Sequence, residues 1–164
     1  MTTGPAIHLT LLFGKREIMA DVEYDVSDLE LGANDAIRAI LKGAKLGITK
    51  GAMAISKDAK LLAPVDTGRL RGSITYVVNA SDDEVSAAIG TSVEYAAYNE
   101  FGTGRSGAGT NVQFGPEDTP VEHDTSRKGH IAQPYIRPAF YGNQEKVKEL
   151  VSDSINEMLS KLSK

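Results

Sequence analysis

A helical repeat over residues 34–62 constrains the fold of this chain more than any other feature. Apolar residues recur there at steps of three and four, which places them on one face of a long α-helix. They are Ile37, Leu41, Ala44, Ile48, Ala52, Ile55, Ala59 and Leu62. Pro64 cannot continue a helix, and it disfavours helical geometry at Ala63 before it. The sequence therefore predicts one long helix that ends just before Pro64.

Three glycines interrupt this predicted helix at four-residue spacing, namely Gly43, Gly47 and Gly51. Each glycine costs roughly 1 kcal/mol of helix stability relative to alanine, so a stripe of them needs a reason. One interpretation is close approach of another backbone, including that of a neighbouring subunit. The other is a bend or a locally weak helix. We expect close packing, and we count the three glycines among the candidate interface residues.

The segment after the helix has the pattern of a turn followed by a β-hairpin. Asp66 and Thr67 can bond the local backbone, and Gly68 can supply a positive φ, so these three residues predict a turn. Alternating apolar residues then predict strands over residues 73–79 and 84–90, with polar residues between them. A short helical turn is expected within residues 92–101.

Residues 147–162 carry a second apolar repeat at helical spacing, opposite Lys and Glu side chains. Together these segments predict an α+β fold. Its long N-terminal helix and its C-terminal helix pack on a small antiparallel sheet, with a long Gly-rich loop. We expect residues 19–164 to form a single domain. Residues 1–18 read either as an extension from an upstream start or as an added edge strand.

The Gly-rich loop is an insert over residues 103–129, rich in Gly, Ser, Thr, Pro and charged residues. Loops of this length without structure are usually functional or disordered. Val112, Phe114 and Val121 could form a short hairpin within it. We expect the insert to be a docking element that becomes ordered only in a complex.

Gly102–Gly107 matches the glycine pattern of dinucleotide-binding turns. That chemistry needs the glycines between a strand and a helix, so that the helix N-terminus meets the pyrophosphate. The residues that follow Gly107 do not read as a helix, and a flexible loop is favoured. A small nucleotide-binding enzyme remains the alternative from a different functional class.

Other catalytic or metal chemistry has little support in the sequence. His8, His123 and His130 lack the paired spacing of zinc ligands, and the chain has no cysteine. Glu122, His123, Asp124 and Ser126 belong to one polar loop without a nucleophile elbow. We expect no catalytic, metal or cofactor site.

Arginines stand next to rigid turns at two places. Arg69 and Arg71 follow Asp66, and Arg137 lies between two prolines. Guanidinium groups suit bidentate pairing with carboxylates, and Glu94 and Glu100 are candidate partners. These pairs would fix the helix–sheet junction or a subunit contact. The alternative is surface charge worth less than about 1 kcal/mol.

Bulk properties exclude two broad classes of partner. A formal net charge of −4 argues against general affinity for nucleic-acid phosphates. No apolar run approaches the roughly 20 residues that a membrane-spanning helix needs.

Three motifs resemble the gene-product-ten family of tailed-phage neck proteins, whose members are called head–tail joining or tail-completion proteins. They are residues 63–74, residues 95–104 and residues 132–140. The first motif follows the predicted long helix, and the last precedes the predicted C-terminal helix. The first 18 residues have no counterpart in the family pattern, and the insert is longer than in many members. The resemblance implies an α+β subunit that forms a ring in the neck and has no catalytic activity.

The expected function is therefore that of a virion structural protein that joins head to tail, present in the host cytoplasm during assembly. Its expected partners are itself, in a homo-oligomeric ring taken as a hexamer, the head connector or adaptor, and the tail tube or tail terminator. DNA at most passes through the lumen, and no membrane is involved. A tail terminator or minor tail subunit is the alternative. The candidate interface residues are Gly43, Gly47, Gly51, Asp66, Arg69, Arg71, Glu100, Phe114 and Arg137.

Overall fold

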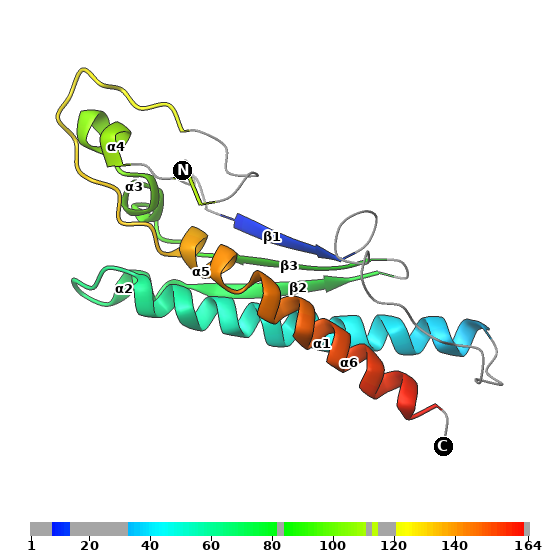
Figure 1. Ribbon diagram of the computed structural model, residues 1–164. Coiled ribbons are helices and arrows are strands. Elements are labelled where there is room, and N and C mark those ends of the chain that lie inside the picture. Colours follow the sequence, from blue (N-terminus) through cyan, green and yellow to red (C-terminus); the bar gives the residue numbers. More distant parts are fainter. Residues whose placement is uncertain (1–7, 14–32, 82–83, 111–112, 115–120, 163–164) are drawn as a thin grey trace. The chain divides into compact units, whose positions relative to one another are not determined.

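The computed structural model describes residues 8–13, 33–81, 84–110, 113–114 and 121–162 (Figure 1). The described elements are β1 His8–Phe13, α1 Ala33–Leu62, α2 Arg69–Ser73, β2 Thr75–Ala80, β3 Val85–Gly90, α3 Ala96–Phe101, α4 Gly104–Thr110, α5 Ile136–Gly142 and α6 Gln144–Ser160. The α+β class, the long helix, the hairpin and the C-terminal helix are confirmed.

The sheet has three strands in the order β1-β3-β2. β2 and β3 form the predicted hairpin, and the backbone N–H of Ser81 donates to the carbonyl of Glu84 at 2.8 Å across its turn. β3 buries Val85, Ala87 and Ile89 in alternation, as its period of two requires. β1 lies at the other side of β3, within the segment for which the sequence leaves an extension or an edge strand open. The neighbouring residues 1–7 and 14–18 lie outside the described ranges.

One helix near the hairpin was not predicted. Gly68 adopts φ 79°, and the chain turns there directly into α2. The N–H of Gly72 donates to the carbonyl of Gly68 at 2.9 Å. The predicted start of the first strand at Ser73 is therefore two residues early, because Arg69–Ser73 is helical.

The chain divides into two compact units, which are described separately. The first unit contains Met1–Leu9, Ala54–Tyr76 and Ile89–Asn143, and the second contains Thr10–Met53, Val77–Ala88 and Gln144–Lys164. The first unit holds the rigid turns and the described parts of the insert. The second holds the glycine stripe.

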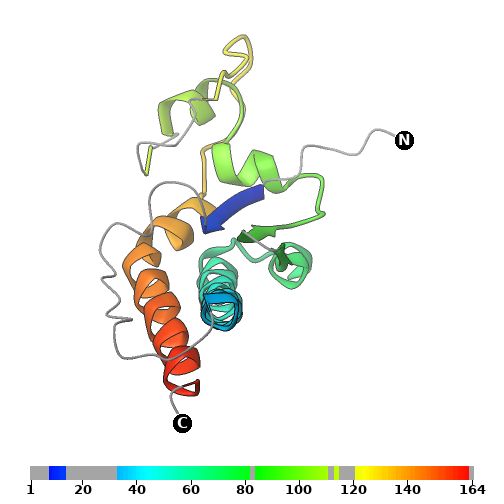
Figure 2. The ribbon, with the colours of Figure 1, turned by 90° about the vertical axis from the view of Figure 1, so that its right-hand side faces the viewer.

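In the second unit, α6 lies side by side with the N-terminal part of α1 (Figures 1 and 2). A Cβ added to Gly43 would lie 2.5 Å from the Cα of Ile155, and one added to Gly47 would lie 2.8 Å from the carbonyl oxygen of Leu150. A Cβ on Gly51 would lie 2.9 Å from a methyl carbon of Val147. Close packing of the stripe is thus confirmed.

The backbone that approaches these glycines belongs to the chain itself. The sequence left open whether a neighbouring subunit supplies this backbone. In the structure, α6 of the same chain fills the space in front of Gly43, Gly47 and Gly51. We therefore do not propose the stripe as a subunit interface. Around it, Ala44, Ile48 and Ala52 of α1 are buried, as are Val147, Val151 and Ile155 of α6.

The predicted apolar face of α1 is correct in its middle and wrong at its ends. About half of the side chain surface of Ile37 and of Leu62 is exposed, although both fit the helical repeat. Periodicity assigns a face of a helix, but it cannot say how far along that face a partner element extends.

Candidate functional site

The first unit is organised around a buried ion pair between Glu100, on α3, and Arg137, on α5. Oε1 of Glu100 accepts hydrogen bonds from Nε and from the backbone N–H of Arg137, both at 3.0 Å. Oε2 accepts from the N–H groups of Tyr135 at 2.8 Å and Ile136 at 3.0 Å. Nη2 of Arg137 donates to the carbonyl of Glu100 at 3.0 Å. We call this group of contacts the clamp.

The clamp explains why a carboxylate is needed at this position. The first N–H groups of a helix have no partner within that helix. No side chain of the N-cap residue bonds to the start of α5, so Glu100 satisfies those N–H groups from 36 residues upstream. Its negative charge also favours the positive end of the helix.

The predicted pairing of Arg137 with Glu100 is therefore found, and the alternative of a surface charge is wrong for this pair. The two side chains are 4% and 0% exposed. Both residues were counted as candidate interface residues, but their charges are directed at each other and at the local backbone. The other candidate partner, Glu94, is exposed and belongs to no such pair among the described residues.

Phe114 connects the insert to the clamp. The guanidinium carbon of Arg137 lies 4.5 Å from the ring centroid of Phe101 and 5.4 Å from that of Phe114. Both distances suit a cation–π interaction. We expected Phe114 to contact a partner protein, but one face of its ring already contacts Arg137 of the same chain. Val112 lies outside the described residues, so the predicted hairpin is not described.

The base of the insert is ordered by backbone hydrogen bonds. The N–H of Thr103 donates to the carbonyl of His130 at 2.9 Å, and that of Arg105 donates to the carbonyl of Arg127 at 3.0 Å. Nδ1 and Nε2 of His123 lie 2.9 Å from the carbonyl oxygens of Val121 and Phe101, and the ring N–H of a neutral imidazole donates to one of the two. The expectation of no helix after Gly107 is wrong, because α4 runs from Gly104 to Thr110.

The glycine pattern Gly102–Gly107 is explained by packing at this base. A Cβ on Gly102 would lie 2.7 Å from the N of Ala132, and one on Gly104 would lie 2.6 Å from the carbonyl oxygen of Arg127. A Cβ on Gly107 would lie 2.6 Å from the carbonyl carbon of Gly102. The element before the pattern is a helix, α3, whereas a dinucleotide turn follows a strand. The feature that suggested a nucleotide site is thus accounted for by the fold.

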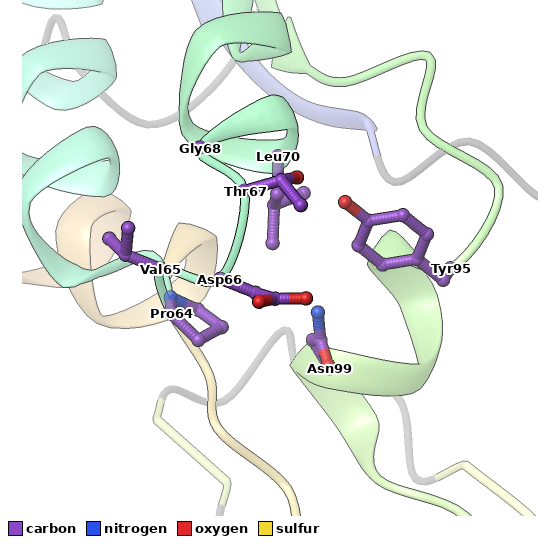
Figure 3. Close-up of a pocket in the computed structure, with 8 residues that line it drawn as sticks. All are labelled: Pro64, Val65, Asp66, Thr67, Gly68, Leu70, Tyr95 and Asn99. Carbon is purple, nitrogen blue, oxygen red and sulfur yellow. The ribbon is translucent and has the colours of Figure 1, made fainter.

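A pocket of about 390 Å³ lies between the turn after α1 and helix α3 (Figure 3). Its lining residues are Pro64, Val65, Asp66, Thr67, Gly68, Leu70, Tyr95 and Asn99. The turn is rigid, since Pro64 fixes one φ angle and Gly68 occupies the left-handed region. Two segments about 30 residues apart in sequence thereby form one concave surface.

Polar side chains converge on this pocket. The carboxylate of Asp66 and the amide of Asn99 point toward each other, and the hydroxyl of Tyr95 is directed toward the same space (Figure 3). In the described part of the chain, none of these three side chains makes a hydrogen bond or ion pair. Arg69 and Arg71 are exposed on α2 and do not pair with Asp66. The pocket therefore has hydrogen-bonding capacity that the described residues do not use.

Apolar surface surrounds these polar groups. Val65 and Tyr95, which line the pocket, are 57% and 37% exposed, and Tyr98 on α3 is 53% exposed. Exposed aromatic and aliphatic groups next to unpaired polar groups are typical of protein interaction sites. The sequence analysis identified Asp66 but missed Tyr95 and Asn99, because only the fold brings α3 against the turn.

Tyr135 stands next to the clamp and is fully buried. Its hydroxyl has no hydrogen-bond partner within the described residues. Burial, followed by the nearby charge of Glu100 and by Tyr95, raises the pKa of Tyr135 well above its ordinary value.

The described residues offer neither a metal cluster nor a membrane span. No group of three or more His, Asp or Glu side chains is arranged there to hold a metal ion. No helix among these residues has the length and apolar character that crossing a bilayer requires.

One family model matches part of this chain. Residues 28–102 match the family model described as "Bacteriophage HK97-gp10, putative tail-component". This match confirms, over that segment, the resemblance to tailed-phage neck and tail proteins. It covers α1, the pocket turn, α2, the hairpin and α3, and it ends where the insert begins. No curated protein and no solved structure matches the chain.

Proposed function

We propose that this chain, which resembles phage tail components over residues 28–102, is a virion structural subunit that joins the head to the tail. The family match is the observation that carries the proposal. The matched segment contains every residue that lines the pocket. In this proposal the chain closes into a homo-oligomeric ring in the neck, and DNA passes through its lumen.

Two features of the first unit support a role in assembly rather than catalysis. The buried clamp fixes α3 and α5 relative to each other without presenting a reactive group to solvent. The pocket presents unpaired polar groups and an apolar rim, which suit a protein partner. Asp66, Arg69, Arg71 and Phe114 are the exposed members of the candidate interface set.

The insert is the proposed contact with the head connector above or with the tail tube below. Val121 and Ile131 are exposed apolar residues on either side of residues 127–128, whose carbonyls accept hydrogen bonds from α4. Exposed apolar groups held on an ordered base lose less conformational entropy on docking than groups on a free loop.

A nonsense mutation in the gene for this chain, made in the phage or prophage that encodes it, tests the proposal. DNA-filled heads and free tails of normal length should accumulate, and wild-type protein supplied in trans should join them. Mass spectrometry of wild-type particles should detect the chain. Tails of abnormal length would instead support the tail terminator alternative. Joined, infectious particles without the chain would refute both roles.

The docking role of the insert needs a separate test. Val121→Ser removes an exposed apolar group from the insert, and Val77→Ser makes the same change on β2, where Val77 is 57% exposed. Head–tail joining should fall for the first variant only, with unchanged melting temperatures for both. Equal joining by both variants would show that this part of the insert does not dock.

A further inference from the structure

We infer that the pocket of one copy of the chain receives the side chain of Arg105 from a second copy. This inference rests on the proposed function, because it names the contact through which the ring would close. It requires that the pocket recognises a guanidinium group and that Arg105 is presented at a fixed position away from that pocket.

The pocket has the chemistry that a guanidinium group needs. The carboxylate of Asp66 is exposed and unpaired within the described chain, so it can accept two parallel N–H donors. The ring of Tyr95 offers a face for cation–π stacking. A lysine could satisfy the charge but neither the bidentate geometry nor the stacking.

Arg105 belongs to a basic cluster that the fold holds together. The N–H of Arg105 donates to the carbonyl of Arg127 at 3.0 Å, and that of Ser106 donates to the carbonyl of Lys128 at 2.9 Å. The backbones of three cationic residues, Arg105, Arg127 and Lys128, therefore lie next to each other. All three are exposed. Arg127 lies 4.0 Å from Asp124 in a pair exposed to solvent, which leaves its charge only weakly offset. The side chain of Arg105 has no partner among the described residues.

The pocket and the basic cluster lie on different sides of α3. Figures 1 and 2 both show α3 between α2, which begins at the pocket turn, and α4, which carries Arg105. All three helices belong to the first unit. A receptor on one side of a subunit and its ligand on the other side form a heterologous contact, which is the kind that closes rings.

Engineered cysteines can detect this contact directly, because the chain has no cysteine of its own. Thr67→Cys places a thiol at the pocket, and Ala108→Cys places one on α4, three residues after Arg105. A mixture of the two variants should form disulfide-linked dimers that contain one chain of each kind. Neither variant alone should do so. Lys57→Cys, at an exposed site on α1, replaces Thr67→Cys in the control mixture.

Charge exchange tests the assigned pair. Asp66→Arg and Arg105→Asp should each weaken self-association by tenfold or more in sedimentation velocity, and the combination of both should restore it. Lys57→Asp, a charge reversal at an exposed site on α1, is the control, and it should leave self-association within a factor of about two of the wild type. Weakened binding in both single variants without recovery in the combination would reject the direct pair.

The outcomes separate this inference from the proposed function. If particles contain the chain but the Asp66 and Arg105 variants join heads to tails normally, the pocket contact is wrong and the joining role stands. If the pocket cysteine in assembled particles links to a different protein, the second copy is the wrong occupant. If wild-type particles lack the chain, the proposed function itself fails.

Discussion

The carboxylate of Glu100 holds Arg137 twice, through Nε and through the backbone N–H, each at 3.0 Å. The two residues stand on either side of the insert in sequence, so this contact brings together the two segments that flank the insert. Both are buried, which makes the contact insensitive to salt and costly to disrupt.

Glu100→Gln should strongly destabilise the chain. The substitution removes the negative charge beside a buried guanidinium and turns an amide N–H₂ toward backbone donors. Removing one partner of a buried ion pair typically costs about 3–5 kcal/mol. Urea unfolding followed by circular dichroism measures the loss. Glu94→Gln is the control, and as an exposed change it should stay within about 0.5 kcal/mol of the wild type. A loss for Glu100→Gln of less than about 1 kcal/mol would contradict the structural role of the clamp.

Gly47→Ala should destabilise the second unit although alanine is the better helix former. Its Cβ would lie 2.8 Å from the carbonyl oxygen of Leu150, so α1 and α6 would have to separate. Overpacking of this kind costs about 1–3 kcal/mol. Gly72→Ala is the matched control, because a Cβ there has no heavy atom within 4 Å. Thermal melting should show a lower midpoint for the first variant and an equal or higher one for the second. Stabilisation by Gly47→Ala would mean that α6 does not cover the stripe.

Tyr135→Phe should leave the chain at least as stable at neutral pH and make it more stable than the wild type at high pH. The raised pKa of Tyr135 keeps its hydroxyl protonated when folded, while the unfolded chain loses that proton above a pH of about 10. The contribution of this group is therefore fully present below that pH and is lost as pH rises further, by at most about 1.4 kcal/mol per pH unit. Urea midpoints at pH 8 and pH 11 test this.

Tyr98→Phe serves as the control for the tyrosine experiment, because Tyr98 is exposed. Its urea midpoints should follow those of the wild type at both pH values. Equal alkaline loss in Tyr135→Phe and in the wild type would show that the burial of this hydroxyl has no influence on stability.

Gly104→Ala should open the base of the insert without unfolding the rest of the chain. Gly104 has φ 60°, and an added Cβ would lie 2.6 Å from the carbonyl oxygen of Arg127. Local strain of this kind costs about 1–3 kcal/mol, which should raise the rate of limited trypsin cleavage after Arg127 or Lys128 by roughly tenfold or more. Gly109→Ala, on the same helix but with open space around it, should not change that rate. Identical cleavage of both variants would contradict the described packing of α4.

Sequence reasoning succeeded where one residue type dictates local geometry. Pro64 sets the end of α1, and Gly68 sets the turn that follows, so both features were predictable, whereas helix α2 after the turn was not predicted. The glycine stripe indicated close packing, but helical spacing cannot tell whether the opposing backbone belongs to the same chain. The structure shows that it does, because the glycines at four-residue spacing on α1 lie against residues at four-residue spacing on α6 of the same chain.

The remaining errors come from contacts between distant segments. α4 has a glycine-rich sequence with low helix propensity, and it is supported by bonds from residues 105 and 106 to residues 127 and 128. The pairing of Glu100 with Arg137 was among the candidates, but its bonds to three successive backbone N–H groups were not. Tyr95 and Asn99 became part of the candidate site only because α3 packs next to the turn.

The packing of α1 on α6 has a consequence for how this sequence can diverge. Gly43 packs against Ile155, Gly47 against Val151 and Gly51 against Val147. The contact positions thus repeat every four residues on both helices, and they run in opposite directions along the chain. A larger residue at one of the glycines can be tolerated only if the opposite position becomes smaller or the helices shift. In related chains, substitutions at these three pairs of positions should therefore occur together. Such paired changes would show how the two helices of distant relatives are to be aligned.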